Sequence, residues 1–192
     1  MNIIQTDINL PGPFKNKLAY TLDNVFTADE CQQLIDLSEE QGYKPALYND
    51  SYRPAQRNNY RCIIDSHEMA NKIYDKIKSH IPKFCNDCEC IGLNERLRFL
   101  RYEPKQYFKS HYDGFYQRSD RERSYITIQL YLNDGFDGGS TRFLDTSSND
   151  FVDCFPKVGR ILVFEHRILH QGMEISDGRK YAIRTDIMYR WK

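Results

Sequence analysis

The sequence lacks an excess of charge of either sign. Its 192 residues include 27 Lys and Arg against 27 Asp and Glu, so the formal net charge is zero. A protein that binds nucleic acid or an anionic membrane through its overall field would be basic, and this composition argues against both kinds of partner. We therefore expect no membrane partner, and the composition disfavours a nucleic-acid partner.

Long apolar runs are missing as well. No stretch approaches the roughly 20 residues that a membrane-spanning helix needs. Asp7, Pro11 and Pro13 fall where a signal peptide would have its apolar segment. The sequence therefore predicts a cytoplasmic protein, with a single domain over residues 1–192 that is long enough to bury a core.

A second cysteine pair is also absent. The chain has six cysteines, and three of them lie close together at Cys85, Cys88 and Cys90. A structural zinc site needs four ligands, usually as two spaced pairs, and no partner pair occurs elsewhere. Without a secretory signal, free thiols are the expected state. We therefore expect this cluster to be a thiol-rich turn.

Two helices are expected in the first half of the chain. Thr27 and Glu30 have the spacing of a capping box, and an apolar stripe follows them as far as Gly42. A second apolar stripe with helical spacing begins near Ser66. The residues between the two helices, 44–62, show no helical period, and so long a connection is typical of a functional lid or a partly disordered segment.

From residue 94 onward the apolar period changes to two, which indicates strands. The expected strands are 96–103, 107–113, 124–133, 140–144, 160–165 and 180–190. Many short strands without helices between them indicate an antiparallel sandwich or barrel, and a jelly roll commonly holds metal sites in its mouth. The predicted fold is α+β and mainly β: a double-stranded β-helix (jelly roll) core over about 94–191, with N-terminal helices from about 20–92 packed on one sheet.

One short motif carries chemistry. His111 and Asp113 are two residues apart, so on a strand their side chains point to the same face. His170 lies 57 residues after Asp113, and Lys180 follows ten residues later. Two imidazoles and one carboxylate can cover one face of a ferrous ion and leave three positions open for a cosubstrate and O2. A cation just beyond the second histidine suits an anionic cosubstrate.

The surroundings of this motif resemble a known family. Residues 98–114 read RFLRYEPKQYFKSHYDG, residues 124–143 read SYITIQLYLNDGFDGGSTRF, and residues 156–189 run from PKVGRILVF through HQG to GRKYAIRTDIMY. These ordered motifs are similar to those of the catalytic domain of prolyl 4-hydroxylases, within the iron(II) and 2-oxoglutarate-dependent oxygenases. The resemblance covers roughly residues 20–190. One departure is Lys105, where such domains usually have Gly, and it affects a turn but no ligand.

The resemblance implies a metal centre and its cofactors. His111, Asp113 and His170 match the positions of the iron ligands. His166 is the alternative for the third position, but it lacks the H-x-G context of His170. The implied cofactors are Fe2+, 2-oxoglutarate and O2, with ascorbate as a candidate supporting reductant. No catalytic residue beyond the metal centre is implied.

The distal carboxylate of 2-oxoglutarate needs a buried cation, because an unpaired buried charge is costly. Lys180 matches the family position, whereas Arg184 shares its strand face and stays the alternative. The resemblance also implies that Thr141, in GG-x-T, and Tyr102, in Y-x-P, hydrogen-bond this cosubstrate.

The substrate is the least specified part. The resemblance implies that a peptide or protein is hydroxylated at proline, with release of succinate and CO2. Arg57, in the 44–62 segment, and Arg123, beside an arginine-rich turn, are candidate substrate contacts; a solvated charged surface is the alternative for both. Related domains also act on free amino acids, so a small-molecule substrate stays open.

Two rival classes remain. A nucleic-acid demethylase would use the same iron chemistry, and Arg96, Arg98 and Arg101 are the residues that suggest one, although the zero net charge does not. A non-enzymatic binding module would keep the fold without needing an intact set of ligands and a cosubstrate cation. The sequence favours a hydroxylase of amino-acid side chains over both.

Overall fold

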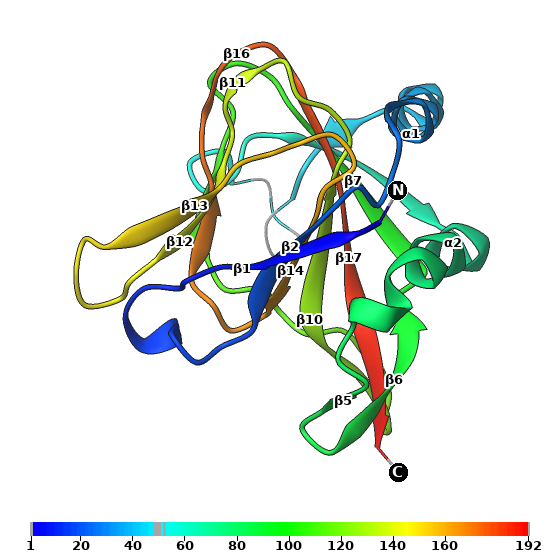
Figure 1. The fold of residues 1–192 in the computed structure, drawn as a ribbon. Coiled ribbons are helices and arrows are strands. Elements are labelled where there is room, and N and C mark those ends of the chain that lie inside the picture. Colours follow the sequence, from blue (N-terminus) through cyan, green and yellow to red (C-terminus); the bar gives the residue numbers. More distant parts are fainter. Residues whose placement is uncertain (1, 48–50, 52, 192) are drawn as a thin grey trace.

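The computed structural model describes residues 2–47, 51 and 53–191. The fold is mainly β, with two α-helices, α1 (Ala28–Gln41) and α2 (His67–Ile77), among the described residues (Figure 1). Within this part of the chain, no helix is long and apolar enough to cross a membrane.

Both helices begin where the sequence predicts. Thr27 Oγ1 accepts a hydrogen bond from the backbone N–H of Glu30 at 3.2 Å, and Glu30 Oε2 accepts one from the backbone N–H of Thr27 at 2.8 Å. Ser66 caps α2 by accepting from the backbone N–H of Met69 at 3.2 Å. These bonds satisfy donors that the first turn of a helix leaves free. Gly42 ends α1 with a positive φ of 81° and a ψ of 151°.

Eleven strands form the larger sheet, and all its pairs are antiparallel. Its main path runs through β1 (Ile4–Asp7), β2 (Ala19–Asp23), β14 (Ile161–Glu165), β10 (Glu122–Tyr131), β17 (Lys180–Trp191), β7 (Arg96–Tyr102), β4 (Tyr60–Asp65) and β3 (Lys44–Pro45). The strands β5 (Phe84–Cys85), β6 (Cys88–Leu93) and β9 (Gln117–Ser119) join it at the side. The long strand β17 therefore lies at its centre, between β10 and β7.

A smaller sheet faces the first one. It contains β13 (Phe151–Cys154), β12 (Thr141–Leu144), β15 (His170–Gly172) and β8 (Phe108–His111), and the short pair β11 (Asp137–Gly138) and β16 (Ile175–Asp177) lies apart from it. In Figure 1, β12 and β13 stand to one side of β10 and β17. Buried side chains of both sheets share one cluster, in which Phe143 of β12 meets Tyr131 of β10 and Ala182 of β17. Two antiparallel sheets around a shared core are the arrangement of a jelly roll.

The two faces of the larger sheet have different partners because side chains alternate along a strand. Ile126 and Ile128 of β10 belong to a buried cluster that also contains Ile35 of α1 and both Ile73 and Ile77 of α2. The alternate residues of the same strands point toward the smaller sheet. This second face contains most of the polar residues described below.

The predicted strands are confirmed with small shifts at their ends, with one exception. The strand expected over 107–113 ends at His111, so Asp113 lies in the loop that follows it. The prediction that His111 and Asp113 share one strand is therefore wrong. The turn at Lys105 forms without glycine: Lys105 takes a left-handed φ of 68°, and its N–H donates to Ile175 O at 2.7 Å.

The first half of the chain contains more strands than its sequence indicates. The segment 44–62, expected to be a functional lid or partly disordered, includes β3 and the start of β4, and its residues 48–50 and 52 lie outside the described residues. The expected thiol-rich turn is the tip of the β5–β6 hairpin, with Cys85 and Cys88 on either side. All six cysteines are free thiols.

Candidate active site

Three potential metal ligands lie close together at one end of strands β8 and β15 of the smaller sheet. His111 ends β8 and His170 begins β15, and the antiparallel register places the two residues opposite each other. Asp113 completes the group, with Oδ1 at 3.6 Å from His111 Nε2 and Oδ2 at 3.8 Å from His170 Nε2. One ligand atom from each residue lies within 4.8 Å of the other two, and all three side chains are buried. The structure therefore brings together the trio that the sequence singles out.

Backbone carbonyl groups orient the two imidazoles. His111 Nδ1 lies 2.7 Å from Lys109 O, and His170 Nδ1 lies 2.9 Å from Ile168 O. A carbonyl only accepts, so Nδ1 carries the proton in both rings and Nε2 keeps a free lone pair. This arrangement is typical of metal-binding histidines. In both rings, the nitrogen with the free lone pair is the one that faces Asp113.

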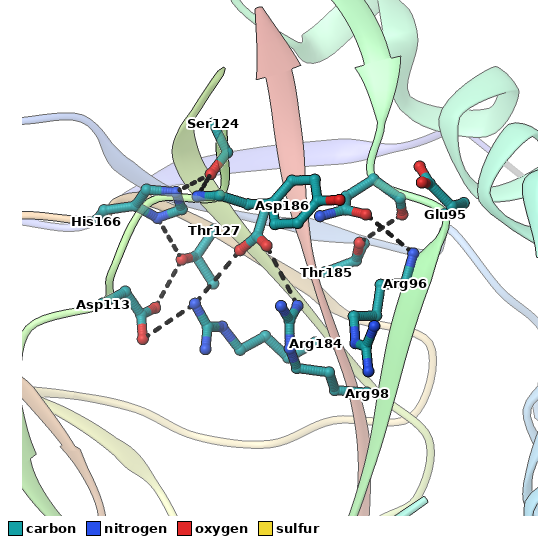
Figure 2. A network of polar contacts seen from close by, with 12 residues as sticks. Glu95, Arg96, Arg98, Asp113, Ser124, Thr127, His166, Arg184, Thr185 and Asp186 are labelled. Atoms are coloured by element: carbon teal, nitrogen blue, oxygen red, sulfur yellow. Dashed lines mark hydrogen bonds and ion pairs between the residues drawn. The ribbon is translucent and has the colours of Figure 1, made fainter. Parts of the chain in front are cut away.

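A chain of hydrogen bonds holds the carboxylate of Asp113 (Figure 2). Thr127 Oγ1 donates to Asp113 Oδ2 at 2.6 Å and, having used its proton, accepts from His166 Nδ1 at 2.8 Å. His166 Nε2 then accepts from Ser124 Oγ at 2.8 Å. Both ring nitrogens of His166 are thus engaged, which leaves no lone pair for a metal. The structure places His170, not His166, with His111 and Asp113.

The protonation states suit a metal. Burial alone would raise the pKa of Asp113, but Arg184, His170 and His111 outweigh it and hold this pKa well below its usual value. Burial lowers the pKa of His170 to about 4. At neutral pH the site therefore offers a charged carboxylate and a neutral His170 imidazole, as metal binding requires. Two imidazoles and a carboxylate are the donor set of non-haem Fe(II) oxygenases.

Lys180 lies in the cavity that opens beside this trio. It begins β17, opposite Tyr102 of β7, and its side chain is 3% exposed. Its Nζ donates to Gly139 O at 2.6 Å and lies 5.3 Å from the ring centroids of Tyr102 and Tyr131. Burial lowers the pKa of Lys180 to about 8. Among the described residues, Lys180 has no carboxylate partner, so it is free to bind an anion.

The hydroxyl groups of Thr141 and Tyr102 lie in the same cavity as Lys180. Thr141 Oγ1 is 2.8 Å from the hydroxyl of Tyr131 and accepts from Gln129 Nε2 at 3.1 Å. Tyr102 is buried and lines the cavity with Thr141 and Lys180. The three residues expected to bind the cosubstrate are therefore neighbours in the fold.

Arg184, the alternative cation, lies at the other end of the cavity. Its Nη2 is 3.2 Å from Asp113 Oδ1 and 3.3 Å from Asp186 Oδ1. The two carboxylates already pair with Arg184, whereas none pairs with Lys180 within the described part of the chain. This difference separates two residues that strand parity alone leaves equivalent.

A comparison with protein families shows which family has a matching sequence around this site. Residues 97–185 match the model of the 2OG-Fe(II) oxygenase superfamily, and this range includes the metal trio and Lys180. Over these residues, the chain carries the sequence of a 2OG-Fe(II) oxygenase domain. Enzymes of this superfamily use Fe2+, 2-oxoglutarate and O2, and both the donor set and the buried unpaired lysine fit these cofactors.

Individual relatives of this oxygenase are prolyl hydroxylases. A putative prolyl 4-hydroxylase of Acanthamoeba polyphaga mimivirus is 23% identical, over 90% of this chain and 74% of that protein. Prolyl 4-hydroxylase 2 of Arabidopsis thaliana is 26% identical, over 85% of this chain and 64% of that protein.

Solved structures share the fold. A prolyl hydroxylase from Trichoplax adhaerens, solved with a peptide fragment of hypoxia inducible factor, superimposes with a TM-score of 0.68 at 17% identity, covering 91% of this chain and 84% of that one. The 2-oxoglutarate complex of a viral collagen prolyl hydroxylase from Paramecium Bursaria Chlorella virus-1 has a TM-score of 0.64 at 23% identity, covering 92% of this chain and 99% of that one.

The two candidate substrate residues of the oxygenase lie in different places. Arg57 is 6% exposed and lines the cavity, with its guanidinium 4.5 Å above the ring of Phe108 and its Nε donating to Asn59 Oδ1 at 2.6 Å. A solvated surface position is therefore wrong for Arg57. Arg123 is not among the residues that line the cavity; its guanidinium stacks 3.7 Å above the partly exposed ring of Phe115.

The arginines that suggested nucleic-acid binding are each paired with an acid. Arg96 lies 3.7 Å from Asp65, Arg98 lies 3.2 Å from Asp186, and Arg101 lies 2.9 Å from Glu39. They therefore form no free basic patch for a phosphate backbone. Only Arg98 lines the cavity, a placement that the sequence did not indicate.

Proposed function

We propose that this oxygenase hydroxylates proline in a peptide or protein and converts 2-oxoglutarate into succinate and CO2. The observation that supports it best is the union of the His111, Asp113 and His170 trio with Lys180 in one cavity. The prolyl hydroxylases among the relatives and the structural neighbours support proline as the target.

In this proposal His111, Asp113 and His170 hold Fe2+, which together with 2-oxoglutarate activates O2 for insertion into a C–H bond. Asp113 supplies the negative charge, and its hydrogen bond from Thr127 keeps the carboxylate oriented toward the two imidazoles. The Nδ1–H bonds of the histidines to backbone carbonyls fix the direction of their free lone pairs.

Lys180 binds the distal carboxylate of 2-oxoglutarate, and the hydroxyls of Thr141 and Tyr102 provide hydrogen bonds beside it. A charge-assisted hydrogen bond in a buried pocket is strong because water does not compete for it. Leu100 and Ala182 line the cavity between the lysine and the arginines and add apolar surface. Their side chains help to exclude water from the reacting groups.

Arg57 and Arg123 are the proposed substrate contacts. Arg57 reaches the cavity from the segment before β4, so it is placed to touch the part of the substrate nearest the metal. Arg123 lies farther out, next to the loop that follows Asp113, where Tyr112 and Phe115 are 45% and 47% exposed. Exposed aromatic rings beside a cation suit an extended peptide that passes over the cavity.

The domain organisation in this proposal is simple. Residues 1–192 act as one domain, and α1 and α2 support the larger sheet on the face opposite the cavity. The shared buried cluster of Ile35, Ile73 and Ile77 with Ile126 and Ile128 supports this arrangement.

A coupled turnover assay tests the function. The purified protein is supplied with Fe2+, ascorbate, 2-oxoglutarate and a library of proline-containing peptides. We expect succinate to form together with peptides that have gained the mass of one oxygen atom, and both products to disappear in Asp113→Ala. Succinate formation with oxygen found only on residues other than proline, or on no peptide, would overturn proline as the target.

A further inference from the structure

Arg98 and Arg184 stand side by side at the metal end of the cavity. They are cross-strand partners on β7 and β17, and both side chains line the cavity. Asp186 lies between their guanidinium groups, with Oδ2 at 3.2 Å from Arg98 Nη1 and Oδ1 at 3.3 Å from Arg184 Nη2 (Figure 2). Arg184 Nη2 also reaches Asp113 Oδ1 at 3.2 Å. The result is a row of alternating charges that ends at the metal trio.

This row has more donors than acceptors. A guanidinium has five N–H groups, and the described hydrogen bonds of Arg98 use one of its nitrogens. The Nε of Arg184 is buried and has no hydrogen-bond partner among the described residues. Buried donors in native proteins are almost always paired, so the Nε of Arg184 is expected to have a further acceptor when the enzyme is loaded.

The charges of the cavity point the same way. Four cations line it, Arg57, Arg98, Lys180 and Arg184, whereas Asp113 is its only lining carboxylate in the described part of the chain and Asp186 lies behind the two arginines. Fe2+ and the doubly negative 2-oxoglutarate neutralise each other. An excess of positive charge therefore remains in the cavity after both cofactors are bound.

Lys180 and the arginine pair are separate sites for negative charge. Lys180 and Arg184 are four residues apart on one strand, which corresponds to roughly 13 Å along the sheet. The apolar residues Ala182 and Leu100 lie between them on the same face. The carboxylate held at Lys180 therefore does not satisfy the free Nε donor of Arg184.

We propose that the substrate brings a carboxylate to Arg98 and Arg184. This inference rests on the proposed hydroxylation of proline, whether free or in a peptide, because the carboxylate belongs to the molecule that is hydroxylated. Two sources share this chemistry: the α-carboxylate of free proline, and an acidic side chain next to the target proline in a peptide. Planar guanidinium groups bind a carboxylate through two parallel hydrogen bonds, which also fixes the orientation of the carbon beside it.

Binding to an unreactive complex tests the inference apart from turnover. The protein is loaded with Mn2+ and N-oxalylglycine, an unreactive analogue of 2-oxoglutarate, and dissociation constants are measured by calorimetry for two matched pairs. One pair is L-proline and L-prolinamide; the other is acetyl-Asp-Pro-amide and acetyl-Asn-Pro-amide. We expect the anionic member of one pair to bind about tenfold more tightly or better than its neutral partner. The pair that differs identifies the source of the carboxylate.

Variants of two residues on β7 test whether Arg98 causes the tighter binding of the anionic compound. Arg98→Gln is expected to bring the affinity of the anionic member down to that of its neutral partner, and Arg98→Lys to restore part of the difference. Arg96→Gln is the matched control: it removes the same charge two residues away, from a side chain that is 45% exposed, pairs with Asp65 and lies outside the cavity. Thermal melting of each variant checks that the protein stays folded.

Three results would overturn the inference. They are equal binding within both pairs, no binding by any of the four compounds, and a preference that survives in folded Arg98→Gln. A weaker affinity of Arg98→Gln for N-oxalylglycine itself, without loss of the preference, would assign the arginine to the cosubstrate instead. Preferential binding of an anionic compound that is never hydroxylated under turnover conditions would support the carboxylate site and count against proline as the target.

Discussion

The metal end and the lysine end of the cavity hold their charges in opposite ways. At the metal end, Asp113 accepts from Thr127 and pairs with Arg184, which pairs in turn with Asp186. At the lysine end, the charge of Lys180 faces only a carbonyl oxygen and two aromatic rings among the described residues. The first end has internal partners for its charges, while the second leaves one cation without a counter-ion.

The difference is visible in the pKa values. Burial alone would lower the pKa of Arg184, but Asp113 and Asp186 outweigh it and the pKa is raised. Lys180 has no such partner, and burial lowers its pKa to about 8. Paired charges keep a metal ligand in place before the metal arrives, whereas an unpaired buried cation is costly until an anion binds. The metal end therefore has charged groups that hold one another in place, whereas the lysine end has a buried cation that suits an anionic ligand.

The strongest test of the metal end removes a ligand. His111→Ala, Asp113→Ala and His170→Ala should each lower Mn2+ or Fe2+ affinity by more than about 100-fold, since even loss of an outer partner costs about 10–100-fold. Turnover should disappear while the circular dichroism of the fold is kept. Full activity in His170→Ala, combined with its loss in His166→Ala, would mean that the third ligand is misassigned.

The lysine end is tested by removing its charge. Lys180→Met keeps the apolar stem and should raise the KM for 2-oxoglutarate by about 10- to 100-fold, the equivalent of one charge-assisted hydrogen bond. Metal affinity should change little, because the described contacts of Lys180 include none of the three metal ligands. If instead Arg184→Met raises this KM strongly and Lys180→Met does not, the cosubstrate carboxylate binds at the metal end.

The pH dependence of cosubstrate binding should separate the ends as well. The pKa of Lys180 is about 8 in the free protein, so the side chain is charged below that pH and neutral above it. The affinity for 2-oxoglutarate should therefore be constant below pH 8 and fall above it, by up to about tenfold per pH unit. Lys180→Arg stays charged throughout and should abolish this decline, as calorimetry across the range would show.

The internal partners of Asp113 predict a smaller effect. Thr127→Val removes the hydroxyl that donates to Asp113 and accepts from His166, and should weaken metal binding by about tenfold. Thr185→Val is the matched control, because Thr185 is also buried but donates to Asn94 O instead. Equal metal affinity in Thr127→Val and the unmodified protein would show that Asp113 is held by Arg184 alone.

The smallest expected change concerns Arg57, which lines the cavity. Arg57→Gln should raise the KM of a peptide substrate several-fold and leave the KM for 2-oxoglutarate unchanged, because Arg57 has no assigned contact with the cosubstrate. A rise in both constants would place Arg57 at the cosubstrate instead of the substrate. Steady-state kinetics with each reactant varied in turn makes the distinction.

The sequence indicates which residues gather in the cavity better than it predicts the whole fold. The strand period of two locates β7 and β17, and the motif spacing singles out His111, Asp113, His170 and Lys180, which line one cavity in the structure. The strand β4 is missed because its residues, YRCIID, have little apolar alternation of their own. Pairing with β7 along its full length, rather than local preference, makes it a strand.

Other features depend on positions that periodicity cannot give. Parity places Lys180 and Arg184 on one face, but only the three-dimensional fold shows which of them has carboxylates nearby. Asp113 reaches the metal trio from a loop, fixed by the bond from its N–H to His166 O at 3.0 Å. That bond joins residues far apart in the sequence, and no local pattern indicates it.

One continuous strand, β17, contains Lys180, Arg184 and Asp186. The spacing of these residues is consequently set by covalent bonds and by ladders to β10 and β7, and not by any loop. Insertions in the exposed turn at residues 145–150 would leave this spacing intact. A homologue can therefore differ in this turn while its charged residues keep their separations. By contrast, a single residue inserted within β17 would turn the residues on one side of the insertion to the opposite face.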